Sequence, residues 1–221
     1  MPGQKMKTSM NRDPIMRRAI NALPIGVVAA AALIVAASAA TGTPNAVIED
    51  SMLVLTEKLD GRKAEFAADR KSLYALIDEM LLPRFDRKFA AQLVLARHWR
   101  SASEAQRTRF IEAFYQALLR RYADGILEFD PNRITVIPFR GDVSKPRTKV
   151  RSTVALDDGS KVAVDYDLVK RDSRWLVYNV VIEGVSYVTN FRAELDAEIR
   201  STSLDAVIVR LEEEAGMSAD E

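Results

Sequence analysis

Few residues in this chain have the types and spacing needed for catalysis or metal binding. The sequence contains one histidine, His98, and no cysteine. A His-based catalytic triad, a multi-histidine metal site, a disulfide and a cysteine-ligated metal are therefore excluded. His98 lies in a predicted helix, and the chain offers no other strong nitrogen or sulfur ligand. We expect a solvent-facing or capping histidine rather than a general base.

Asp165 and Asp167 are a carboxylate pair that acid–base chemistry could use. They lie two residues apart on a predicted strand and so share one face of it. Charged residues are expected on the outward face of a half-solvated sheet, which favours a solvent-facing pair. A cone-shaped isomerase-type enzyme with an aspartate base and a tyrosine donor is an alternative, and it requires one aspartate to point into the cone. The nine glycines are scattered and form no phosphate-binding loop.

The charge is unevenly distributed along the chain. The formal net charge is +1, but residues 1–39 hold five bases and one acid, which leaves −3 for the remainder. A domain so close to neutral lacks the basic surface that nucleic-acid binding needs. We therefore expect no nucleic-acid partner.

The N-terminus has the order of features found in a secretion signal. Basic residues between Lys5 and Arg18 precede an apolar stretch from Leu23 to Ala37, and the small residues that follow predict cleavage after Ala39. An uncleaved anchor over 22–40 is the alternative, because that stretch nearly reaches the ~20 residues of a spanning helix. The sequence predicts a cleaved signal peptide over residues 1–39, a single domain over 40–216 and a flexible tail over 217–221.

Residues 47–126 have the apolar spacing of amphipathic helices. We expect one helix that ends at Gly61, a second from Lys63 to Leu82, and a third capped by Asp86. A capping box from Ser103 to Gln106 opens a long helix. Its broad apolar stripe is partly aromatic and contains Phe110, Phe114, Leu118, Tyr122 and Ile126.

From residue 133 the apolar period changes to two and β-branched residues become frequent. The expected strands are Arg133–Arg140, Lys149–Leu156, Ser160–Arg171 and Arg174–Glu183. Gly159 is expected in the left-handed position of a three-residue loop. In the last hairpin a tight turn would pair Leu168 with Val177, whereas a one-residue bulge would pair it with Tyr178, so the face of Tyr178 and Asn179 is left open.

Two more helices follow Gly184, and this order of elements predicts an α+β fold. We expect the helices to pack on one side of a curved four-stranded antiparallel sheet. Such a cone, NTF2-like in shape, can enclose an apolar pocket, although the same pattern fits a filled core.

The segment from Trp175 to Arg192 reads WLVYNVVIEGVSYVTNFR and closely resembles the signature of the MlaC family, also called the toluene-tolerance auxiliary family. The similarity extends over about 47–211. Two residues depart from the pattern: Asn179 stands where many members carry an acid, and Tyr187 replaces a more usual aliphatic residue. Supporting similarity lies in Phe85, Asp86, Trp99, Ser103, Gln106, Phe110, Phe114 and Tyr122.

The resemblance implies a periplasmic carrier, not an enzyme, that holds a glycerophospholipid as cargo and needs no cofactor or metal. It implies shuttling between an outer-membrane lipoprotein–porin complex and the inner-membrane Mla ABC transporter complex, which helps maintain outer-membrane lipid asymmetry. A hopanoid-associated carrier of the same family and a structural protein with a filled core are the alternatives.

Two acyl chains would need a cavity at or above ~1,000 Å³, the upper end of ordinary ligand sites. No residue is assigned to the headgroup. The residues expected to line the tail pocket are Phe110, Phe114, Leu118, Val154, Val164, Tyr166, Leu168, Tyr178, Val180 and Ile182.

Overall fold

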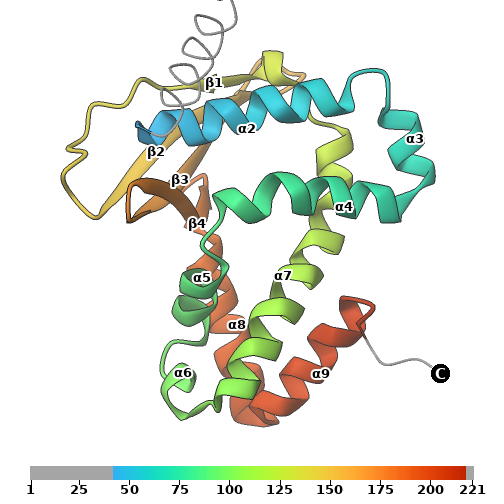
Figure 1. The fold of residues 1–221 in the computed structure, drawn as a ribbon, viewed down its shortest axis with the longest axis vertical. Coiled ribbons are helices and arrows are strands. Elements are labelled where there is room, and N and C mark those ends of the chain that lie inside the picture. Colours follow the sequence, from blue (N-terminus) through green and yellow to red (C-terminus); the bar gives the residue numbers. More distant parts are fainter. Residues whose placement is uncertain (1–41, 218–221) are drawn as a thin grey trace, which may run out of the picture. The chain divides into compact units, whose positions relative to one another are not determined.

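The computed structural model describes residues 42–217, which form an α+β unit (Figure 1). The predicted signal peptide, the alternative anchor and residues 218–221 of the predicted tail lie outside this range. No helix within it is both long and apolar enough to cross a bilayer. Its α-helices are α2 (Pro44–Leu59), α3 (Lys63–Ala68), α4 (Arg70–Leu81), α5 (Arg87–Leu95), α6 (His98–Ser101), α7 (Glu104–Leu127), α8 (Tyr187–Ser201) and α9 (Leu204–Glu214). Its strands are β1 (Ile134–Val136), β2 (Arg147–Ala155), β3 (Lys161–Arg171), β4 (Arg174–Ile182) and β5 (Val185–Ser186).

The single helix expected from Lys63 to Leu82 is wrong, because the structure divides it at Asp69. Asp69 has φ −117° and ψ 89°, and its Oδ1 accepts a hydrogen bond from Ser72 N at 3.1 Å. Aspartate is a favoured N-cap, and here the capping geometry prevails over the continuous apolar spacing. The chain therefore enters α4 in a new direction.

The capping box that opens α7 is confirmed. Ser103 Oγ accepts from Gln106 N at 3.1 Å, and Gln106 Oε1 accepts from Ser103 N at 2.9 Å. The helix then packs against α4, α5 and α9 (Figure 1). Phe110 stacks on Phe114 with ring centroids 5.4 Å apart, and both belong to a core that α8 and α9 complete.

The sheet has five strands in the order β1-β2-β3-β4-β5, all antiparallel, so the expected count of four is wrong. The missed strand, β5, follows a two-residue turn in which Glu183 and Gly184 have φ of 48° and 80°. Two positive φ values fit the twist of a tight hairpin. β1 is shorter than expected, because the chain leaves the sheet at Pro138 after one further bond from Ile137 N to Arg151 O at 2.9 Å.

The expected register of β2 and β3 is confirmed. Val150 lies opposite Tyr166, Arg151 lies opposite Asp165, and Gly159 has φ 81° in the loop between the strands. We call the face that carries Val150 and Tyr166 the inner face and the face that carries Arg151 and Asp165 the outer face. α2 lies across the inner face (Figure 1). There Ile48 packs in one cluster with Val150, Leu168, Trp175 and Val177.

The last hairpin combines features of both expected registers. Arg171 pairs with Arg174 across a tight turn, and Leu168 pairs with Val177 as the tight-turn register predicts. A bulge then follows, because Asp167 pairs with Asn179 and Tyr178 is the extra residue. The inner face of β4 therefore carries Val177, Val180 and Ile182.

Candidate functional site

Two apolar chambers lie between the helices and β4. The first, which we call the α2 chamber, has a volume of about 310 Å³ and lies between the inner face of the sheet and helices α2 and α4. It is lined by Ile48, Ser51, Met52, Leu55, Ile77, Met80, Leu81, Arg84, Phe85, Ile126, Phe129, Ile134, Tyr166, Val177 and Val180.

The second, which we call the α8 chamber, has a volume of about 290 Å³ and lies among α5, α7, α8 and β4. It is lined by Phe85, Ala90, Val94, Phe114, Leu118, Tyr122, Tyr178, Asn179, Val180, Ile182, Tyr187, Val188 and Phe191. The single cavity of ~1,000 Å³ expected for two acyl chains is thus replaced by two smaller spaces.

Phe85 and Val180 line both chambers and so form the wall between them. The backbone holds Phe85 against the sheet: Phe85 forms a parallel bridge with Val177, and Asp86 N donates to Val177 O at 2.8 Å. Asp86 is fixed in turn, because its carboxylate caps α5 through Phe89 N at 2.9 Å and pairs with Arg171 Nε at 2.7 Å. This wall is therefore anchored to both the sheet and α5.

The bulge in β4 decides which chamber each of its residues reaches. Val177 lines the α2 chamber, whereas Tyr178, the extra residue of the bulge, lines the α8 chamber and packs edge-on against Phe89 with ring centroids 4.9 Å apart. A regular strand would have placed Val177 and Val180 on opposite faces, since side chains alternate. Because of the bulge, side chains of β4 line both chambers.

Among the residues that line the two chambers only Arg84 carries a charge, and several of the polar groups bond to protein atoms. Asn179 Nδ2 donates to Asp167 Oδ2 at 2.7 Å, Ser51 Oγ to Val47 O at 2.6 Å, and an Arg84 nitrogen to Met80 O at 2.8 Å. Burial raises the pKa of Tyr166 and of Tyr178 above that of a free tyrosine, so both hydroxyls stay neutral at physiological pH. Such walls suit an apolar ligand.

Six of the ten predicted tail-pocket residues line a chamber. Phe114, Leu118, Tyr178 and Ile182 line the α8 chamber, Tyr166 lines the α2 chamber, and Val180 lines both. The structure places the other four elsewhere. Phe110 and Leu168 are fully buried in the packed core, and Val154 and Val164 lie on the inner face beyond the lining of either chamber.

Residues of α2, α4 and α8 that line the chambers were not among the predicted ones. The apolar stripes of these helices are evident in the sequence, but helical spacing is the same beside a cavity and beside a filled core. The sequence shows Tyr187 only as a departure from the family pattern. In the structure its ring lies 5.9 Å from that of Tyr122 at the wall of the α8 chamber.

His98 is neither solvent-facing nor a cap, so that expectation is wrong. Its side chain is 18% exposed, and its Nε2 lies 2.8 Å from Asp196 Oδ1 on α8. This hydrogen bond is the main reason that the pKa of Asp196 lies below its ordinary value. The positive charges of Arg97 and Arg200 lower it further. The histidine fastens α6 to α8 and faces neither chamber.

Asp165 and Asp167 lie on the outer face, where Lys149 Nζ pairs with them at 3.3 and 3.4 Å. Tyr166, between them in the sequence, points the opposite way into the α2 chamber. The isomerase alternative required one of these carboxylates inside the cone, and that condition is not met.

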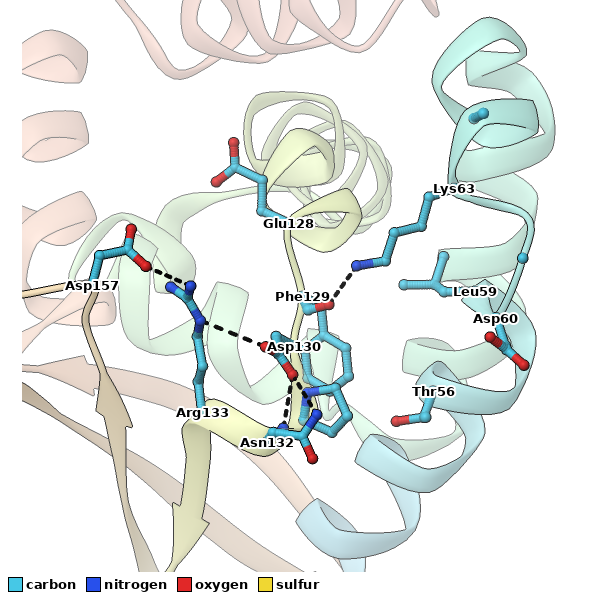
Figure 2. Close-up of a pocket in the computed structure, with 13 residues that line it drawn as sticks. Thr56, Leu59, Asp60, Lys63, Glu128, Phe129, Asp130, Asn132, Arg133 and Asp157 are labelled. Carbon is cyan, nitrogen blue, oxygen red and sulfur yellow. Dashed lines mark hydrogen bonds and ion pairs between the residues drawn. The ribbon is translucent and has the colours of Figure 1, made fainter. Parts of the chain in front are cut away.

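A polar cleft of about 970 Å³ opens where α2 ends, beside the turn that joins β2 and β3 (Figure 2). Lys63 Nζ donates to Phe129 O at 2.7 Å, and Arg133 lies between Asp130 and Asp157. Its charged lining residues are Asp60, Glu128, Asp130, Asp157, Lys63 and Arg133. Because acids outnumber bases and both bases are already engaged, this cleft does not suit a phosphate group.

Comparison with known proteins gives consistent matches. A family model described as MlaC protein matches residues 50–213. The chain is 27% identical over 154 residues to the toluene tolerance protein ttg2D of Pseudomonas putida, covering 69% of this chain and 71% of that protein. It is 19% identical over 186 residues to the intermembrane phospholipid transport system binding protein MlaC of Haemophilus influenzae, covering 83% of this chain and 87% of that protein.

A solved structure shares the fold. The phospholipid-binding protein from Ralstonia solanacearum, determined in complex with a phospholipid, matches with a TM-score of 0.69 and 23% sequence identity. The match covers 79% of this chain and 98% of that one.

Proposed function

The chain belongs to the MlaC family, and on that premise we propose that it is a carrier of glycerophospholipid which holds one acyl chain in each chamber. The proposed carrier works in the periplasm and is not an enzyme. It exchanges lipid with an outer-membrane lipoprotein–porin complex and with the inner-membrane Mla ABC transporter complex, and so helps to maintain outer-membrane lipid asymmetry.

The observation that carries this proposal is the pair of apolar chambers on either side of Phe85 and Val180. A diacyl lipid has two chains joined at one end, and two neighbouring chambers with a shared wall match that form. Exposure costs ~0.8 kcal/mol per methylene, so a sixteen-carbon chain that crossed water uncovered would cost about 12 kcal/mol. A carrier therefore has to cover nearly all of each chain.

The relatives support the same cargo. The Haemophilus influenzae protein is named as the binding protein of an intermembrane phospholipid transport system, and the Ralstonia solanacearum structure contains a phospholipid. The predominantly apolar lining described above fits acyl chains and offers no group suited to catalysis on a headgroup.

The decisive experiment is lipid extraction from the protein purified from the periplasm, followed by mass spectrometry and by a melting curve before and after delipidation. We expect a co-purified glycerophospholipid and a lower melting temperature once it is removed, because a ligand that binds only the folded state stabilises it. Absence of lipid together with an unchanged melting temperature contradicts the proposal. If the extract contains a hopanoid instead, the protein is still a lipid carrier, but its cargo is a hopanoid.

A matched pair of variants links the lipid to the chambers. Val180→Asp places a carboxylate in the wall that both chambers share, and we expect the bound lipid to be lost because burying an unpaired charge beside acyl chains is costly. Val209→Asp makes the same change on α9, where the side chain is 46% exposed, and should leave the bound lipid unchanged. Equal lipid content in the two variants would place the cargo elsewhere.

A further inference from the structure

The sheet ends on one side at a strand that is only partly covered. β1 pairs with β2 at residues 152–154, and one further bond joins Ile137 N to Arg151 O at 2.9 Å. The chain then leaves the sheet as a wide loop, residues 138–146, before it returns as β2 (Figure 1). Within residues 42–217, the first part of β2, Arg147–Val150, pairs with β3 alone.

The unpaired backbone groups of β2 can be identified from the hydrogen bonds on its two sides. Pro146 O accepts from Lys170 N of β3 at 2.8 Å, whereas Arg151 O accepts from Ile137 N on the opposite side. Alternate residues of a strand direct their N–H and C=O groups to the same side. Arg147 and Lys149 therefore direct theirs toward the free edge.

A groove of about 660 Å³ follows this edge. Its walls are residues 137–141 on one side and residues 148–151 on the other, and Asn45 from the first turn of α2 closes it. Asn45 is 7% exposed and fixes the loop through a hydrogen bond from its Nδ2 to Ile137 O at 3.1 Å. Its Oδ1 accepts no hydrogen bond from the described residues. The groove is thus held open by a fixed loop and lies beside unpaired backbone groups of β2.

The charged residues that line the groove are all basic: Arg140, Lys149 and Arg151. Lys149 is paired with Asp165 and Asp167, while Arg140 and Arg151 form no ion pair with any residue in 42–217. Basic residues on a strand edge oppose pairing with a second copy of the same edge, because like charges would face one another. An acidic segment has the complementary charge.

We propose that this edge binds an extended acidic segment of a partner protein, which adds to the sheet beside Arg147–Val150. Main-chain hydrogen bonds to Arg147 and Lys149 supply affinity, and alternate side chains supply selectivity. Acidic side chains on the outer face meet Arg140 and Arg151, while apolar ones on the inner face lie beside the buried Val150. The groove shares no lining residue with either chamber, so this site is independent of the lipid cargo.

The test uses two fluorescent eight-residue peptides with blocked ends, one alternating valine with glutamate and the other alternating valine with lysine. We expect the glutamate peptide to bind saturably and less tightly as salt is added, and the lysine peptide not to bind. The double variant Arg140→Glu/Arg151→Glu should weaken binding at least tenfold. Arg174→Glu, an exposed change at the start of β4, is the matched control and should bind as the unaltered protein does.

A second variant separates strand addition from simple charge attraction. Lys149→Pro removes the N–H that faces the groove and leaves the bonds from β2 to β3 in place, because proline is tolerated where the N–H of an edge strand is free. Lys149→Ala removes the same side-chain charge and keeps the N–H, so it is the control: we expect both variants to melt alike, Lys149→Ala to retain the glutamate peptide and Lys149→Pro to lose it. The proposal is overturned if both peptides bind equally, if neither binds, or if Lys149→Pro binds the glutamate peptide fully. If neither peptide binds, the cations at this edge serve only to prevent self-association.

Discussion

Asn179 shows how one residue in the signature segment joins two elements. Its Nδ2 donates to Asp167 Oδ2 at 2.7 Å and to Ser186 Oγ at 3.0 Å, while its Oδ1 accepts from Val188 N at 3.0 Å. Ser186 is the N-cap of α8, so this 6%-exposed amide ties the beginning of α8 to the sheet. A side-chain amide can donate to Asp167 and accept from Val188 at once, whereas an ionised carboxylate can only accept.

We predict that Asn179→Asp destabilises the protein by about 1–3 kcal/mol at neutral pH, because a hydrogen bond from a buried amide to the Asp167 carboxylate is replaced by repulsion between two carboxylates. The neighbouring charge of Asp167 raises the pKa of the new carboxylate above its unfolded value of ~3.9. The new carboxyl group at position 179 is therefore least unfavourable to folding when it is protonated, below a pH of ~3.9. This advantage is lost as the pH rises through the pKa of the group in the folded state.

Urea unfolding from pH 4 to pH 8 measures this effect, with Asn179→Ala as the control. The alanine variant loses the bonds that Nδ2 donates and also the one that Oδ1 accepts from Val188 N, but it introduces no titrating group. The difference in unfolding free energy between the two variants should shrink as the pH falls toward 4. A difference that does not change with pH would show that Asp167 does not act on position 179.

At the scale of elements, the segment that leads into α5 and the bulged strand β4 together form the wall between the chambers. Phe85 is held to Val177 by the backbone and lines both chambers. We predict that Phe85→Ala joins the chambers and lets the two acyl chains meet. The change removes a large side chain from a wall and leaves the backbone bridge in place.

A phospholipid with a pyrene on each chain reports this directly, because two pyrenes in contact emit as an excimer. The unaltered protein with one lipid bound should show monomer emission, and Phe85→Ala should gain excimer emission. Phe89→Ala is the matched control, since Phe89 contacts Tyr178 but lines neither chamber. Strong excimer emission from the unaltered protein would contradict one chain per chamber.

Most elements followed from the sequence, and the exceptions have identifiable physical causes. The capping box, Gly159 and the β2–β3 register were predictable because each depends on residues close together in the chain. The break at Asp69 and the strand β5 were missed. At both places a short turn, polar in one case and glycine-containing in the other, changes the direction of the chain although the apolar spacing continues. Whether the chain turns there or continues straight depends on tertiary packing.

At the scale of the whole described unit, the sequence predicted an apolar site but not its shape. Ile48 and Met52 on α2 were known to be apolar, and nothing in their spacing distinguishes a chamber wall from a filled core. The wall residue Val180 was predicted, yet its role depends on the bulge at Tyr178, which alternation along a strand cannot reveal. Whether a cavity remains depends on the combined side-chain volumes of several helices and strands.

The chamber volumes lead to a prediction about chain length. If a methylene occupies about the ~30 Å³ of a water molecule, a chamber near 300 Å³ holds roughly ten carbons. Up to that length, each added methylene should tighten binding by ~0.8 kcal/mol, or about fourfold. Beyond it the gain per carbon should fall, because packed helices must separate to admit the remainder and lose contacts with one another.

Displacement of a fluorescent phospholipid by phosphatidylcholines with chains of six to sixteen carbons tests this prediction. We expect the logarithm of affinity to rise steeply to about ten carbons per chain and less steeply afterwards. Val180→Asp, which we expect to lose its lipid, should bind neither the fluorescent phospholipid nor any of these competitors. A constant slope to sixteen carbons would mean that the chambers enlarge at no cost, and the space seen between these helices would then not limit the cargo.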